Sequence, residues 1–218
     1  MRLFVAVRPP ATVRAHLDRA LDLVRGGPDL GDSRRSLRWA APEDRHLTLA
    51  FYGEVSAGAG EELIAGVAAI AGQSAPLEVH LRGAGVFDRR VLWIGCGGHV
   101  SALAALSARC VELGEEVSGR ADRRVRSRAH LTVARVTGRD RARLAGRSRR
   151  PDAEASSADD VATLAHALAV YEGPTWRVED VVVFSSRPGE GRGGGPAYDE
   201  VATFALRDLP DPPPSARL

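Results

Sequence analysis

Two short segments of the chain repeat one pattern, HLTLAF at residues 46–51 and HLTVAR at residues 130–135. On a β-strand the side chains alternate between faces, so each histidine shares a face with the threonine two residues later. An imidazole with its ordinary pKa near ~6.5 can give or take a proton at neutral pH, and a hydroxyl can hydrogen-bond phosphate oxygens. If the two strands face each other, His46, Thr48, His130 and Thr132 converge. With one imidazole neutral and one protonated, they are suited to phosphodiester cleavage.

A single His-X-Thr arises easily by chance, but two copies at the starts of two predicted strands point to a shared function. The two histidines lack a Cys, Asp or Glu at ligand spacing and make a poor zinc site. We therefore expect no metal and no cofactor. The remaining histidines lack this context and are interpreted as structural: His16, His80, His99 and His166.

The elements that must position these groups follow from apolar periodicity and from glycine and proline punctuation. Strands are predicted at 2–7, 46–52, 77–81, 91–94, 176–184 and 198–206, and at the second triplet. Helices are predicted from the Pro9-Pro10 pair to Gly26, at 56–71, across Leu103–Val117 and at 159–168. Because each half brings one His-Leu-Thr strand, the order of elements suggests an old duplication.

Composition narrows the class of protein. No apolar run approaches the roughly 20 residues of a membrane span, the start does not resemble a signal peptide, and Cys96 and Cys110 form no metal-spacing motif. We expect a cytoplasmic monomer with reduced core cysteines and no membrane partner. The net charge is +2, yet Arg120 to Arg150 holds twelve arginines against two acids. That excess could attract a phosphate backbone, or it could be a solvated loop.

Beyond the triplets, the chain resembles the two-histidine (2H) phosphoesterases, specifically the RNA 2′,3′-cyclic phosphodiesterases related to 2′-5′ RNA ligases. RLFVAVRPP is similar to the opening strand of that family, VFDRRVLWIG to its middle hairpin, and YEGPTWRVEDVVVFSSRPG with Tyr198 to its closing segment. The resemblance implies a bilobal α+β fold in which antiparallel strands line a central cleft and helices pack outside. We expect residues 1–209 to form this domain, with a surface insertion at 137–158 and a proline-rich tail at 210–218.

The resemblance also implies a reaction, the metal-independent opening of an RNA-terminal 2′,3′-cyclic phosphate to a 2′-phosphate. RNA ends of this kind, including tRNA fragments, would be the partners. In this scheme His46 protonates the leaving 3′ oxygen, His130 activates water, and Thr48 and Thr132 hold the phosphate. The site is nearly symmetric, so the reverse assignment of acid and base stays open. The family also uses the arginine that closes the second motif, Arg135 here, as a phosphate ligand.

Strand parity places Arg135 on the face opposite His130, unless a bulge turns it back. The same parity places Phe51 in the core with Leu47 and Leu49. A departure from the family is Ala129, where relatives have a proline before the second histidine; Arg128 stands near the place of a family aromatic. We expect these changes to alter nucleotide preference and to leave the chemistry intact.

Two other functions remain open. The chain could act on a small cyclic phosphate such as that of ADP-ribose, or on 2′-5′ oligonucleotides by hydrolysis or ligation. It could also be a module that binds RNA ends without turnover, although two intact triplets argue against this.

Overall fold

The computed structural model describes residues 1–26, 37–119, 129–136 and 161–207. The predicted insertion at 137–158, the predicted tail and most of the arginine-rich stretch lie outside the described residues.

Strands and helices are interspersed along the described chain. In order they are β1 (Arg2–Val7), α1 (Ala11–Arg25), β2 (Leu37–Trp39), β3 (Leu47–Glu54), α2 (Ala57–Gly72), β4 (Leu77–Phe87), β5 (Val91–Gly98), α3 (Val100–Ser118), β6 (His130–Val136), β7 (Trp176–Val178), β8 (Asp180–Arg187) and β9 (Ala197–Ala205). Residues 161–167 are also helical, inside the predicted 159–168. The predicted strand at 176–184 is divided into β7 and β8, because β7 pairs with β4 and β8 pairs with β1 and β9.

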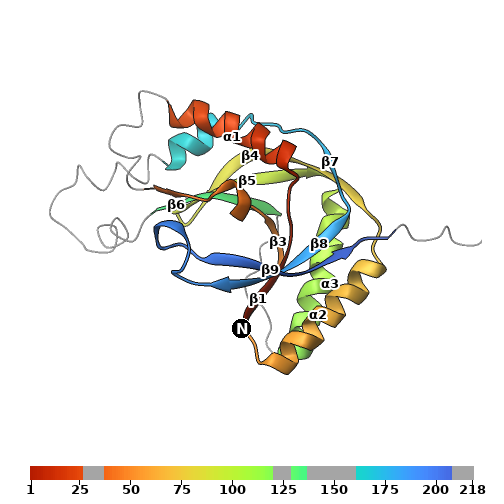
Figure 1. The fold of residues 1–218 in the computed structure, drawn as a ribbon. Helices are drawn as coiled ribbons and strands as arrows, with labels where there is room; N and C mark the ends of the chain where they lie inside the picture. The colour runs from red at the N-terminus through yellow and green to blue at the C-terminus, as the bar shows by residue number, and fades with distance from the viewer. Residues whose placement is uncertain (27–36, 120–128, 137–160, 208–218) are drawn as a thin grey trace, which may run out of the picture.

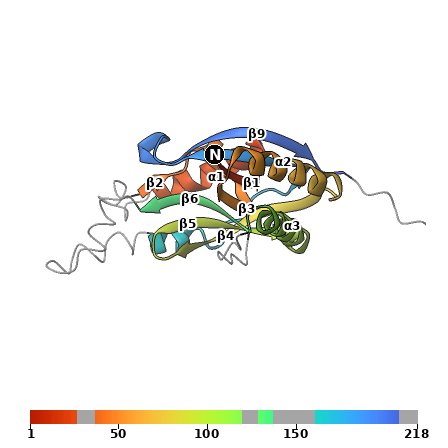
Figure 2. The same cartoon turned by 90° about the horizontal axis from the view of Figure 1, so that it is seen from below.

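The strands form one antiparallel sheet with two lobes (Figures 1 and 2). One lobe has the strand order β7-β4-β5-β6, with β2 also pairing with β6; the other has the order β3-β1-β8-β9. Among the described residues, β3 and β6 join the lobes through one residue pair, Leu47 with Leu131. The predicted α+β fold with antiparallel strands and two lobes is therefore confirmed.

The lobes do not correspond to consecutive halves of the sequence. The lobe containing β3 is completed by β8 and β9 near the end of the described chain, and the β6 lobe combines β4, β5 and β6 with the early strand β2 and the late strand β7. A duplication of whole sequence halves, which the repeated triplet suggests, stays a prediction.

The helices pack outside the sheet around one large apolar core (Figure 1). α1 lies beside the helical residues 161–167 (Figure 1), and its His16 Nδ1 is 3.1 Å from the hydroxyl of Tyr171, which follows that helix; α2 lies against α3. Leu3 and Val5 of β1 face this core, whereas Phe4 and Ala6 face the opposite side of the sheet and form a second, smaller cluster with Val182 and Phe184. β1 therefore buries both of its faces, and the smaller cluster lies on the side that carries the histidines.

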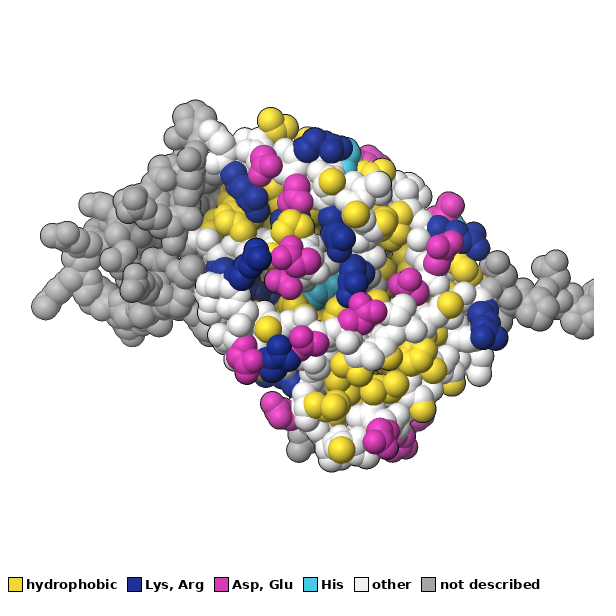
Figure 3. Space-filling model, viewed as in Figure 1, with side chains coloured by type: hydrophobic (Ala, Val, Ile, Leu, Met, Phe, Trp, Pro, Cys, Tyr) yellow, Lys and Arg dark blue, Asp and Glu magenta, His cyan; other side chains and the backbone are white. Residues whose placement is uncertain are grey.

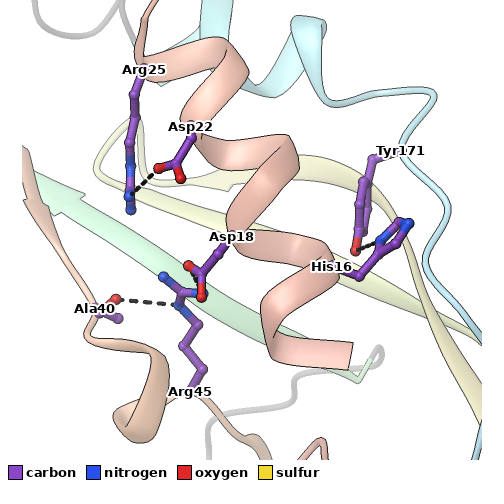
Figure 4. Close-up of polar contacts among 7 residues, drawn as sticks. All are labelled: His16, Asp18, Asp22, Arg25, Ala40, Arg45 and Tyr171. Carbon is purple, nitrogen blue, oxygen red and sulfur yellow. Dashed lines mark hydrogen bonds and ion pairs between the residues drawn. The ribbon is translucent and has the colours of Figure 1, made fainter. Parts of the chain in front are cut away.

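A buried ion pair ties α1 to the turn that precedes the first triplet (Figure 4). The side chain of Arg45 is 1% exposed; its Nη1 lies 2.7 Å from Asp18 Oδ1, and its Nε donates to the Ala40 carbonyl at 3.2 Å. A guanidinium so far from water is stable only while its charge is matched. Because Arg45 adjoins His46, this contact fixes the chain at the entrance to β3.

Removing the carboxylate of Asp18 tests this anchor. Asp18→Ala leaves the Arg45 charge buried without its counter-ion and should lower the free energy of unfolding by about 3 kcal/mol, measured by urea denaturation. Asp22→Ala is the matched control on the same helix, since the Asp22 side chain is 70% exposed and contacts Arg25 at 3.3 Å. It should cost less than about 1 kcal/mol. Equal losses in the two variants would show that the Arg45 pair is not an anchor.

Candidate active site

The two triplets lie on neighbouring antiparallel strands at the junction of the lobes. Leu47 and Leu131 pair there, and both are fully buried. Because neighbouring side chains alternate, the histidine and threonine on either side of each leucine point to the other face of the sheet. All four of these side chains line one cavity of about 1820 Å³, as does Arg135. Figure 3 shows this face, with a histidine visible in a hollow bordered by arginines and acidic side chains.

Two matching β-bulges follow the triplets. On β3, Thr48 pairs with Ala6 and Ala50 pairs with Val5, so Leu49 is an extra residue. On β6, Thr132 pairs with Trp93 and Ala134 with Leu92, so Val133 is an extra residue. The carbonyl oxygens of the two extra residues have hydrogen-bond donors. The Ser107 hydroxyl of α3 donates to the Leu49 carbonyl at 2.6 Å, and the Ala40 amide donates to the Val133 carbonyl at 2.9 Å. An inserted residue reverses the facing of everything that follows it.

The bulges decide the positions of Arg135 and Phe51. The second bulge brings Arg135 to the face of His130 and Thr132, where it lines the cavity. The first bulge does the same for Phe51, which packs beside the Phe4 cluster and lines the cavity. The prediction that Phe51 faces the core with Leu47 and Leu49 is wrong, because simple alternation does not hold across the bulge.

His46 is held by a local backbone contact. The 3₁₀ turn Pro42–Asp44 ends just before it, and His46 Nδ1 lies 2.8 Å from the Asp44 carbonyl oxygen. A carbonyl only accepts, so Nδ1 carries a hydrogen and Nε2 is the nitrogen that gains or loses the proton. The ring lies 4.8 Å from Phe4 and 5.3 Å from Tyr198, measured between centroids. The rotamer and tautomer of His46 are thereby set before any ligand binds.

His130 has a comparable aromatic setting in the other lobe. It is 7% exposed, and its ring centroid lies 4.8 Å from that of Phe87 and 6.2 Å from that of Trp93. Gly85, opposite Trp93, makes room for the indole, since a Cβ there would lie 2.2 Å from a ring carbon. Ala129, in the place of the family's proline, lines the cavity beside His130. The aromatic residues around the two histidines were not predicted as site residues. The sequence indicates them only through their alternating positions on strands that adjoin the triplets.

The electrostatic environment favours the neutral form of His46. Burial is the main cause that lowers its pKa to about 4; the Asp44 carbonyl acts in the opposite direction, and the charges of Arg135, Arg8 and His130 add to the lowering. The unliganded imidazole is therefore neutral at pH 7 and takes a proton only as the pH falls toward 4. The influence of Arg135 and His130 on this ring shows that positive groups from both lobes gather around it. A bound anion would relieve that repulsion.

No group of three or more His, Cys, Asp or Glu side chains in the described part of the chain could hold a metal ion. None of the helices among the described residues is long and apolar enough to cross a membrane.

The titration of His46 can be followed by NMR through its imidazole protons. In the unliganded protein its pKa should lie near 4. Arg135→Gln should raise this pKa, because a nearby positive charge is removed, and added inorganic phosphate should raise it as well. Arg19→Gln, at an arginine of α1 outside the cavity, is the control and should leave the pKa unchanged. An unliganded pKa at or above the ordinary value of 6.5 would contradict the described environment.

The chain is similar in sequence to known phosphoesterases. The family described as LigT like Phosphoesterase matches residues 9–93. An RNA 2′,3′-cyclic phosphodiesterase of Geobacillus stearothermophilus is 36% identical over 119 residues, 48% of this chain and 35% of the relative. One from Aquifex aeolicus is 27% identical over 111 residues, 49% of this chain and 59% of the relative. One from Methanothermobacter thermautotrophicus is 28% identical over 211 residues, 94% of this chain and 99% of the relative. The matches to the first two thus span only part of those proteins, whereas the third is matched along nearly its whole length.

Solved structures show the same fold. TT0787 of Thermus thermophilus is 24% identical, with a TM-score of 0.67 over 95% of this chain and 98% of that one. LigT of E. coli in its apo form is 20% identical, with a TM-score of 0.64 over 95% and 98% of the two chains. By its family match and its curated relatives, the chain is similar to the LigT-like phosphoesterases, and it shares the fold of the solved structures.

Proposed function

We propose that the chain is an RNA 2′,3′-cyclic phosphodiesterase that opens a terminal cyclic phosphate to a 2′-phosphate. The observation that carries the proposal is the convergence of His46 and His130, from different lobes, on one cavity that Thr48, Thr132 and Arg135 also line. The curated relatives described above bear the name of this activity. The set contains two proton carriers and three phosphate ligands, which are the groups that hydrolysis of a phosphodiester needs.

In the proposed reaction, His130 takes a proton from water as the water oxygen bonds to phosphorus. The bond from phosphorus to the 3′ oxygen breaks, and His46 gives that oxygen a proton from Nε2. The products are a 2′-phosphate and a 3′-hydroxyl. Thr48, Thr132 and Arg135 would donate to the non-bridging oxygens, where negative charge concentrates in the transition state.

The low pKa of His46 bears on this assignment. A general acid must hold its proton when the substrate is bound, and the unliganded imidazole is neutral at pH 7. The negative charge of the cyclic phosphate, placed between His46, His130 and Arg135, raises the pKa of His46 and supports the acid role. The reaction could also proceed with the roles exchanged, with His46 as the base and His130 as the acid. The neutral form of His46 in the unliganded cleft fits that assignment. The choice can be tested separately from the activity.

The activity is tested with a nucleoside 2′,3′-cyclic phosphate and with a short RNA that ends in one, both in EDTA. We expect the 2′-phosphate as the sole product, identified by chromatography against the 3′ isomer. The 3′ isomer, or a requirement for added metal, would exclude this mechanism.

Alanine variants test the proposed roles. His46→Ala and His130→Ala should each lower kcat by about 10²–10⁴-fold, the usual contribution of a general acid or base. His166→Ala, at an exposed histidine outside the cavity, is the control and should keep full activity. On a p-nitrophenyl phosphodiester, whose leaving group needs no proton, the variant lacking the acid should lose much less activity than the variant lacking the base. If His130→Ala is the milder variant there, the roles are exchanged.

A further inference from the structure

A second arginine lies beside Arg135 in the cleft. Strand β2 pairs with β6, and Arg38 is directly opposite Arg135 in that pairing. Side chains directly opposite each other in an antiparallel pair point to the same face, and both arginines line the cavity. Like charges in this arrangement destabilise a sheet. A bound anion between or above the two guanidinium groups removes the repulsion.

The surroundings of Arg38 leave its guanidinium available. It makes no ion pair or side-chain hydrogen bond with any other described residue. It lies against the glycine-rich turn between β8 and β9, where a Cβ on Gly195 would be 3.4 Å from its Nε and 3.5 Å from its Cζ. The guanidinium therefore passes close to this turn, on its way to the cavity that it lines.

The position of Arg38 relative to the proposed reaction centre suggests what it binds. Between Thr132 and Arg135 the partner strand advances two residues, from Trp93 to Val91, or about 7 Å along β6. Arg38 lies on the neighbouring strand, about 5 Å from Arg135, at the edge of β6 with which β3 also pairs. Tyr198 contacts the ring of His46, and its pKa is raised, chiefly by burial; the charges of Arg135 and Arg38 act in the opposite direction. Positive charge therefore extends from His130 along β6 to Arg135 and to Arg38 on the paired strand β2.

We propose that Arg38 binds the phosphodiester one nucleotide upstream of the terminal cyclic phosphate. This rests on the proposed function and specifies its substrate class, an oligonucleotide with a cyclic phosphate end rather than a mononucleotide or another small cyclic phosphate. A guanidinium can hold two oxygens of a phosphodiester at once, and such a backbone contact places the chain without reading its sequence.

The test compares two substrates that differ by one phosphodiester, a nucleoside 2′,3′-cyclic phosphate and a dinucleotide that ends in the same cyclic nucleotide. The measured quantity is the ratio of kcat/KM for the dinucleotide to kcat/KM for the mononucleotide. Arg38→Gln should lower this ratio by roughly tenfold or more, through KM for the dinucleotide. The slope of log KM against log salt concentration for the dinucleotide should fall by about 0.7, the increment for one phosphate contact on a single strand. Arg38→Lys should restore part of the ratio, and Arg19→Gln should leave it unchanged.

The outcomes separate the two proposals. If the wild-type protein turns over neither substrate, the proposed function fails and this inference fails with it. If the wild type is active and Arg38→Gln lowers kcat/KM equally for both substrates, Arg38 serves the reacting phosphate or the fold, and the second subsite is excluded. An unchanged ratio together with an unchanged salt slope excludes it as well.

Discussion

One residue pair sets the geometry of the cleft. Leu47 and Leu131 form the pairing between β3 and β6 among the described residues, and both are fully buried. Since a histidine precedes each leucine directly, a shift between the lobes at this pair moves one imidazole against the other. Packing fixes each ring within its own lobe, through Phe4 and Tyr198 on one side and Phe87 and Trp93 on the other. The distance between the rings therefore depends on the leucine contact and on the core beneath it.

The electrostatics of the cleft suit an anion. The charges of Arg135, Arg8 and His130 all lower the pKa of His46. Arg38 and Arg135 lie directly opposite each other on the paired strands β2 and β6. Such a set of charges costs stability in the empty protein, and the arrival of negative charge offsets that cost. Arg8 is partly compensated by Glu200 at 2.9 Å, whereas Arg38 has no such partner among the described residues. The uncompensated charge of Arg38 thus lies on β2, directly opposite Arg135.

Much of this arrangement follows from patterns in the sequence, and the rest depends on contacts between distant segments. Alternation within HLT places His46 with Thr48 and His130 with Thr132, and apolar spacing finds α1, α2 and α3. Strict alternation predicts the wrong face of the sheet for Phe51, and it does not decide the face for Arg135. A bulge at Leu49 or Val133 exists only through its partner strand and the groups, Ser107 and Ala40, that satisfy it. The pairing of Arg38 with Arg135 likewise depends on register, which no local pattern specifies.

The chain path through the two lobes has a consequence for biosynthesis. Strand β1 is made first, but one of its two neighbours is β8, formed by residues 180–187. Until those residues leave the ribosome, Leu3, Phe4 and Val5 lie on a strand with an open edge, and open apolar edges pair readily with other chains. The β4–β5–β6 portion has no such delay, because its strands follow one another with only α3 between. The lobe that carries the first triplet is therefore the last of the two to close, and β1 stays exposed to misassembly until β8 has been made.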